Sequence, residues 1–78
     1  MIYNYKYLME IRFKNSMSQS MLAQKLNLSI RQVSRLENGI NFLSVENLIK
    51  YCEIFKDFNI NKLFINEKSE GDNENVGE

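Results

Sequence analysis

The sequence contains no histidine and no proline, and its 78 residues include a single cysteine, Cys52. One cysteine cannot form a disulfide within the chain, and without histidine the common zinc sites and nucleophile–histidine pairs lack an essential member. No apolar run approaches the ~20 residues that span a bilayer, and no secretory signal pattern opens the chain. We therefore expect a cytoplasmic protein that is not an enzyme, needs no cofactor and no metal, and does not enter a membrane.

The composition favours helices over strands. Proline is absent, only three glycines occur, and leucine, isoleucine and lysine are abundant. A chain of 78 residues provides one domain with a modest hydrophobic core. We predict an all-α fold.

The charge is divided unevenly along the chain, although the formal net charge is zero. Residues 67–78 carry five acidic and one basic side chain, a net charge of −4. Residues 1–66 therefore carry nine basic and five acidic side chains, a net charge of +4. Because the last segment has almost nothing apolar to bury, we predict a folded, mildly basic domain over 1–66 and a disordered acidic tail over 67–78.

Residues 18–39 have the pattern of two short helices joined by a tight turn. Ser18 and Ser29 can each cap a helix start, and apolar residues recur at helical spacing after each of them. The spacing predicts helices over residues 19–26 and 30–37. Such a pair can place its second helix in the DNA major groove, or it can be a plain helical hairpin whose polar residues only keep it soluble.

An ordered set of residues runs through this stretch and beyond it: Leu8, Ile11, Arg12, Ser18-Gln19, Leu22-Ala23, Leu28-Ser29, Val33-Ser34, Leu36-Glu37-Asn38-Gly39, Ser44, Leu48 and Leu63-Phe64. With this set, the chain resembles the helix-turn-helix domains of the phage repressor/Cro-like family. The resemblance covers about residues 6–64. It implies a compact five-helix, lambda-repressor-like fold that binds DNA.

The resemblance also implies which side chains face the DNA bases. They lie on the first turns of the second motif helix: Ser29, Ile30, Arg31, Gln32, Ser34 and Arg35. An arginine can pair with two acceptors of guanine, and Ile30 can pack against a thymine methyl group. Ile30 departs from the amide side chain that is frequent in the family. The alternative for either arginine is a phosphate contact.

Four residues are the expected phosphate ligands. Gln19 lies on the first turn of the first motif helix, where its amide and the free N–H groups of the helix end can reach a phosphate. Asn38 and Gly39 follow the second helix and offer backbone N–H groups and an amide, or serve only as a helix cap. Asn41 offers a further amide from the next loop.

The resemblance further implies a structural ion pair between Arg12 and Glu37. Such a pair would tie the first helix to the third, and it would orient elements more than it stabilises them. The alternative is two solvated surface charges.

We also predict three helices outside the motif. The first begins at Asn4, as a cap, and ends near Lys14; the fourth covers about residues 45–55; the short fifth runs through Leu63 and Phe64. On the fourth helix, we expect one apolar side to hold Val45, Leu48, Ile49 and Cys52, with Cys52 as a small core hydrophobe.

The loop at residues 40–43 reads Ile-Asn-Phe-Leu, where relatives tend to be basic and polar. Its apolar side chains either fold into the core or contact a second subunit. Apolar residues here and nearer the C-terminus exceed what a small domain can hide. The dimer interface candidates are Phe42, Leu43, Tyr51, Phe55, Phe58, Ile60 and Phe64.

These observations predict a sequence-specific transcriptional regulator, a repressor in particular, that binds a near-palindromic operator in double-stranded DNA as a homodimer through the major groove. One alternative is a restriction–modification controller protein that both activates and represses. Another is a protein-interaction module, such as an antitoxin or adaptor, which the hydrophobic loop and the acidic tail favour. The tail can shield the basic surface from non-specific DNA, contact a second protein partner, or serve only as a soluble end.

Overall fold

The computed structural model describes residues 1–66, and the acidic segment 67–78 lies outside the described residues. The elements, in chain order, are β1 (Ile2–Tyr3), α1 (Lys6–Lys14), α2 (Gln19–Leu26), α3 (Ile30–Glu37), α4 (Val45–Ile54), α5 (Ile60–Leu63) and β2 (Phe64–Ile65). The predicted five-helix, all-α fold is confirmed, with one short strand pair that the sequence did not indicate. The predictions of a disordered tail and of its partner or shielding role stay predictions.

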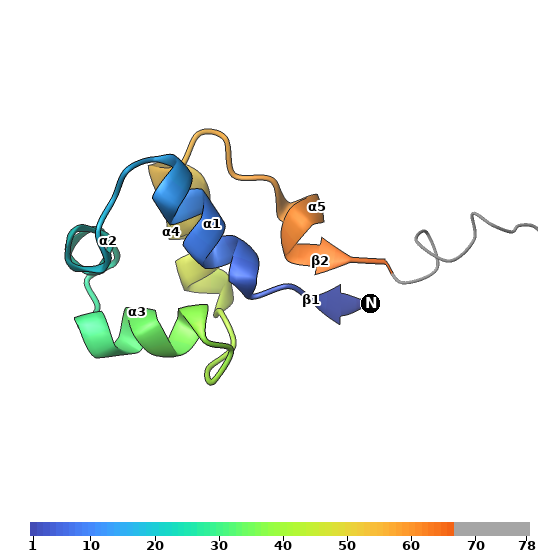
Figure 1. The fold of residues 1–78 in the computed structure, drawn as a ribbon, viewed down its shortest axis with the longest axis horizontal. Helices are drawn as coiled ribbons and strands as arrows, with labels where there is room; N and C mark the ends of the chain where they lie inside the picture. Colours follow the sequence, from blue (N-terminus) through green and yellow to red (C-terminus); the bar gives the residue numbers. More distant parts are fainter. Residues whose placement is uncertain (67–78) are drawn as a thin grey trace, which may run out of the picture.

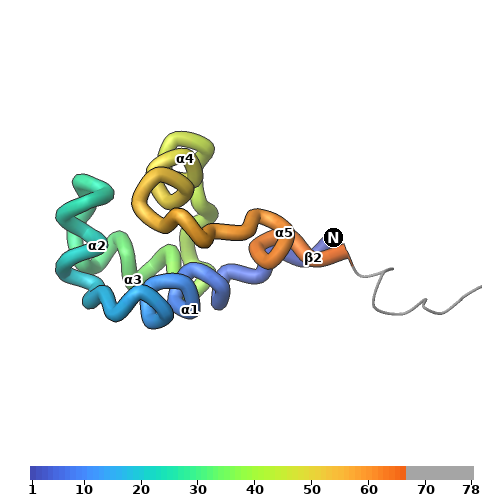
Figure 2. The backbone as a smooth tube through the Cα atoms, turned by 90° about the horizontal axis from the view of Figure 1, so that it is seen from above, coloured from blue at the N-terminus to red at the C-terminus, as the bar shows by residue number. Residues whose placement is uncertain are grey.

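The four longer helices form a compact group, with α1 on one side, α4 on the opposite side, and α3 along the edge between them (Figures 1 and 2). Helix α5 and the strand pair project from one end of this group, at the side away from α2. The core contains Tyr7, Leu8, Ile11, Leu22, Ala23, Leu26, Val33, Leu36, Tyr51, Phe55 and Leu63. Side chains of all five helices therefore meet in one core, and this packing holds α3 in place.

The helices of the motif begin and end where the sequence predicts. The Ser18 hydroxyl accepts a hydrogen bond from the Met21 N–H at 3.1 Å, which caps α2. Asn27 ends α2 in the left-handed conformation, at φ 59°. Ser29 and Gln32 form a capping box at the start of α3, in which each side chain accepts from the other residue's backbone N–H. Local capping chemistry thus sets the turn between the two helices.

The predicted start of the first helix is wrong. Helix α1 begins at Lys6 with no side-chain cap, and Asn4 does not cap it. Asn4 instead faces the other end of the chain, since its Nδ2 donates to the Lys62 carbonyl at 3.0 Å and its N–H donates to the Leu63 carbonyl at 2.7 Å. The antiparallel pairing of β1 with β2 brings Asn4 next to Lys62. These two residues are 58 positions apart in the chain, so no local sequence pattern indicates their contact.

The predicted apolar side of the fourth helix is correct for Leu48, which packs against the core, and wrong for Val45, Ile49 and Cys52. Val45 and Ile49 are 73% and 54% exposed, and Cys52 is exposed as well. The buried side of α4 holds Tyr51, and Phe55 follows directly after the helix. Residues 45, 49 and 52 form one stripe at helical spacing, and residues 48, 51 and 55 form another. Periodicity does not choose between the stripes, and the larger aromatic side chains gain more from burial.

Two of the predicted dimer residues are therefore core residues. Tyr51 is 0% and Phe55 is 1% exposed, and their rings pack against each other with centroids 5.8 Å apart. Phe58 is half-buried against the rings of Tyr7 and Tyr51. Tyr51 and Phe55 cannot contact a second subunit, because the domain already encloses them.

The buried hydroxyl of Tyr51 has no hydrogen-bond partner within residues 1–66. Burial raises the pKa of Tyr51, so this hydroxyl stays neutral and uncompensated. We expect Tyr51→Phe to keep or raise the free energy of unfolding, by up to about 1 kcal/mol. Tyr7→Phe is the matched control, because the Tyr7 oxygen accepts from the Asn59 N–H at 2.8 Å. Tyr7→Phe should lower the free energy of unfolding by about 1 kcal/mol. Urea unfolding followed by circular dichroism measures both, and the reverse ranking would contradict the prediction.

Candidate nucleic-acid interface

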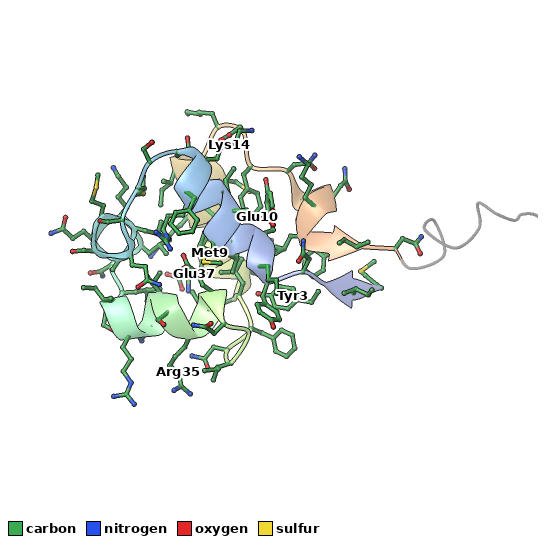
Figure 3. All side chains as sticks on the ribbon, viewed as in Figure 1. Tyr3, Met9, Glu10, Lys14, Arg35 and Glu37 are labelled. Atoms are coloured by element: carbon green, nitrogen blue, oxygen red, sulfur yellow. The ribbon has the colours of Figure 1, made fainter. Side chains whose placement is uncertain are left out.

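Helix α3 has one side in the core and one side in solvent. Val33 and Leu36 are buried, at 0% and 4% exposure. On the other side, Arg31 is exposed and Arg35 is half-exposed, and the two side chains lie one helical turn apart. Figure 3 shows Arg35 directed away from the body of the domain. Neither guanidinium takes part in an ion pair within residues 1–66, so both are available to an external partner.

The remaining predicted base-facing residues divide into two groups. Ile30 is 50% exposed at the first position of α3. The Ser29 hydroxyl accepts from the Gln32 N–H at 3.1 Å, and the Gln32 Oε1 accepts from the Ser29 N–H at 2.9 Å. The Ser34 hydroxyl accepts from the Asn38 amide at 3.3 Å. The capping box thus occupies Ser29 and one oxygen of Gln32, while Ile30 and the arginines keep their side chains open.

The backbone N–H groups of the turn after α3 already donate to carbonyl groups of α3. The Asn38 N–H donates to the Ser34 carbonyl at 3.0 Å, and the Gly39 N–H donates to the Leu36 carbonyl at 3.2 Å. The Asn38 amide also donates to the Ser34 carbonyl, at 2.8 Å. Helix capping thus employs both N–H groups, which is the alternative that the sequence left open, and a phosphate contact from Asn38 or Gly39 stays a prediction. The exposed Asn41 side chain follows in the same turn.

Two tyrosines near the N-terminus support this turn. Gly39 has φ +74°, and a Cβ built there would lie 2.7 Å from the Tyr5 ring, so only glycine fits. The Tyr3 hydroxyl accepts from the Leu43 N–H at 3.3 Å. Neither contact was predicted from the sequence. No local pattern in the sequence indicates either contact, because Tyr3 and Tyr5 contact residues far along the chain.

Behind α3, a buried network joins three helices. Arg12 Nε donates to Glu37 Oε2 at 2.6 Å, and Arg12 Nη2 donates to Glu37 Oε1 at 2.9 Å. Both residues are about 5% exposed or less. Hydrogen bonding to Glu37 raises the pKa of Arg12. The predicted ion pair between α1 and the end of α3 is present, and it is bidentate and buried rather than solvated.

Two further groups complete this network. Arg12 Nη1 donates to the Met17 carbonyl at 2.9 Å, in the loop before α2. Gln19 Nε2, on the first turn of α2, donates to Glu37 Oε1 at 3.1 Å. One carboxylate therefore fixes the start of α2 relative to the end of α3. No local pattern in the sequence indicates the contact between Gln19 and Glu37.

The loop between α3 and α4 divides its apolar side chains between the core and the surface, and the contact with a second subunit stays a prediction. Leu43 is half-buried and packs against the core. Ile40 and Phe42 are exposed, at 61% and 82%. The Phe42 ring lies against Tyr3, with centroids 5.2 Å apart. Of the other dimer candidates, Ile60 and Phe64 are exposed, at 45% and 38%.

Within residues 1–66, no helix is long and apolar enough to cross a membrane, and no group of three or more metal-ligating side chains comes together. A protein-family model described as a helix-turn-helix matches residues 8–61, more than half of the chain. No curated protein and no solved structure matches the sequence significantly.

Proposed function

The chain belongs to the phage repressor/Cro-like helix-turn-helix family and is a DNA-binding transcription regulator, and from this premise we propose that it binds a near-palindromic operator as a homodimer and represses transcription. Helix α3 enters the major groove, as the second helix of such motifs does. The observation that carries the proposal is the pair of unengaged arginines on the outer side of α3, held there by a packed core.

Base reading comes from the side chains that the fold leaves open. Arg31 and Arg35 each have the donors for a bidentate pair with guanine. Ile30, half-exposed at the start of α3, packs against a thymine methyl group. Gln32 has its oxygen in the capping box and keeps its amide hydrogens for a base or phosphate.

Phosphate contacts come from the start of α2 and from the loop after α3. Gln19 uses one amide hydrogen for Glu37, and its second hydrogen is aimed by that bond at a neighbouring phosphate. The first N–H groups of α2 add donors and the positive end of the helix dipole. The Asn41 amide supplies a further contact from the loop.

A dimer follows from how little DNA one short helix reads. Helix α3 has eight residues and contacts a few base pairs, too few for selection of one site in a genome. A second copy about one helical turn away, ~34 Å along the DNA, reads the symmetric half-site. A restriction–modification controller protein that both activates and represses uses the same geometry.

A protein-interaction module, such as an antitoxin or adaptor, is the second candidate function. It is favoured by the exposed Phe42 and Ile40 beside the recognition helix. The apolar side chains of this loop offer no donor to a phosphate group, but they can be buried against an apolar surface of another protein.

Salt dependence separates the two candidates. We expect the protein to enrich a preferred duplex from a random-sequence pool and to bind it with an affinity that falls by about 10³-fold or more between low and moderate salt. Fluorescence anisotropy across a salt series measures this slope. Absence of duplex binding, together with salt-insensitive binding to a protein partner, would overturn the operator proposal and favour the interaction module.

A further inference from the structure

Helix α4 carries an apolar stripe that nothing within residues 1–66 covers. Val45 is 73% exposed, Ile49 is 54% exposed, and Cys52 is exposed. The three residues are four and three positions apart, so they lie on one side of the helix. The core uses the other apolar side of α4, so this stripe plays no part in holding the domain together.

The direction of the stripe follows from the contacts of α4. Lys50 Nζ donates to the Leu26 carbonyl at 3.3 Å, so the Lys50 side of α4 faces α2. Val45 lies roughly 140° away from Lys50 around the helix, at about 100° per residue. The stripe therefore faces away from α2. Figure 2 shows α5 and β2 on that opposite side.

Aromatic side chains extend the stripe beyond α4. Phe42, two residues before the Ser44 cap of α4, is 82% exposed. Its ring lies 5.2 Å from Tyr3, and the ring of Tyr3 lies 5.7 Å from Phe64, which is 38% exposed. We call the surface formed by Phe42, Val45, Ile49, Cys52 and Phe64 the apolar flank. Exposed Glu46 and Glu53, three and four positions from Ile49, border it on α4.

The size of the apolar flank fits a contact between two small subunits. A large aromatic side chain offers ~150–250 Å², so the exposed parts of these five residues sum to on the order of 500 Å². A single exposed apolar patch of that size marks an interaction site. Two facing copies would bury on the order of 1,000 Å² in total, which is the lower limit for a specific interface.

We propose that the apolar flank is the two-fold interface with a second copy of this chain, and that the second copy packs over the α4 stripe. The inference rests on the proposed operator binding, which requires two copies. The flank begins in the loop after α3 and continues along the side of α4 that faces away from α2. A two-fold axis through the flank makes the contact isologous, and the proposed operator binding requires that it leave both α3 helices facing the same DNA.

The test is the oligomeric state without DNA. Sedimentation equilibrium from micromolar to millimolar concentration should show a monomer–dimer equilibrium for the wild-type chain. Ile49→Glu should raise the dissociation constant at least tenfold, because it places a charge in the contact. Met21→Glu, on α2, is the matched control: Met21 is 49% exposed, close to the 54% of Ile49. Since both side chains are exposed, both variants should keep the wild-type melting temperature at concentrations where the wild type is monomeric.

Cys52 reports on the same surface. As the one cysteine of the chain, it should react with maleimide more slowly as the protein concentration rises, and Ile49→Glu should abolish that protection. A wild-type chain that stays monomeric throughout, or a dimer that Ile49→Glu leaves intact with Cys52 equally reactive, would overturn the proposal. These measurements contain no DNA. Failure of duplex binding would therefore count against the operator proposal and leave the interface result standing.

Discussion

Replacing Glu37 by alanine is expected to lower the free energy of unfolding by about 3–5 kcal/mol. The substitution leaves the Arg12 guanidinium buried at 5% exposure without its carboxylate. It also removes the acceptor of the Gln19 amide. A buried charge that loses its partner costs far more than a pair removed together, because its desolvation is no longer offset. For a domain whose total stability is about 5–15 kcal/mol, this loss approaches complete unfolding.

Two controls distinguish this cause from a general loss of contacts. The double variant Arg12→Met with Glu37→Leu removes both charges and should recover most of the stability lost by Glu37→Ala. Glu46→Ala breaks a surface pair, in which Lys50 Nζ lies 3.6 Å from Glu46 and the Glu46 side chain is 80% exposed, and it leaves the hydrogen bond from Lys50 to the Leu26 carbonyl in place. It should cost about 1 kcal/mol or less. Urea unfolding followed by circular dichroism measures all three. Equal stability of Glu37→Ala and wild type would show that the pair does not form in solution.

The motif could be predicted from the sequence because its boundaries are set locally. Ser18, Asn27 and Ser29 act on groups within four residues of themselves, and such contacts leave a readable pattern. The buried pair of Arg12 and Glu37 was predicted by resemblance alone. Its geometry depends on how α1 crosses α3, which no local spacing encodes.

The features that were missed depend on contacts between distant parts of the chain. The pairing of Tyr3 with Phe64 joins the two ends of the described domain, and the support of Gly39 by Tyr5 crosses 34 positions, from 5 to 39. On α4, two apolar stripes compete, and only the position of α1 and α2 decides which one is buried. Cys52 is therefore exposed on the stripe that this packing leaves uncovered.

The residues predicted to contact DNA could be assigned from the sequence on α3 but not in the turn that follows it. The exposed side of α3 is well predicted, because an amphipathic helix shows its outer residues in the sequence. The turn after α3 is not, because Asn38 and Gly39 look like donors until their acceptors in α3 are known. Side chains that cap a helix in this structure are poor candidates for binding DNA, and this shifts the expected readout onto Ile30 and the two arginines.

Replacing Arg31 or Arg35 by alanine is expected to lower operator affinity about 30- to 10⁴-fold each. One bidentate pair with guanine is worth ~1–3 kcal/mol, and a dimer loses it in both half-sites. Folding and dimerisation should not change, because neither guanidinium makes an ion pair within residues 1–66. Lys56→Ala removes the same charge from the exposed turn after α4, so it controls for general electrostatic attraction and should have a much smaller effect.

The pattern of loss across sequences assigns each arginine its role. An arginine that pairs with guanine should, when replaced, relax selectivity at one position of each half-site. An arginine that binds phosphate should weaken all duplexes uniformly and reduce the salt slope by about one. Anisotropy titrations with the selected duplex and with single-position variants of it provide both readouts. If both alanine variants bind the selected duplex as tightly as wild type, then α3 does not read DNA through this side. The exposed arginines would then have to serve a different partner.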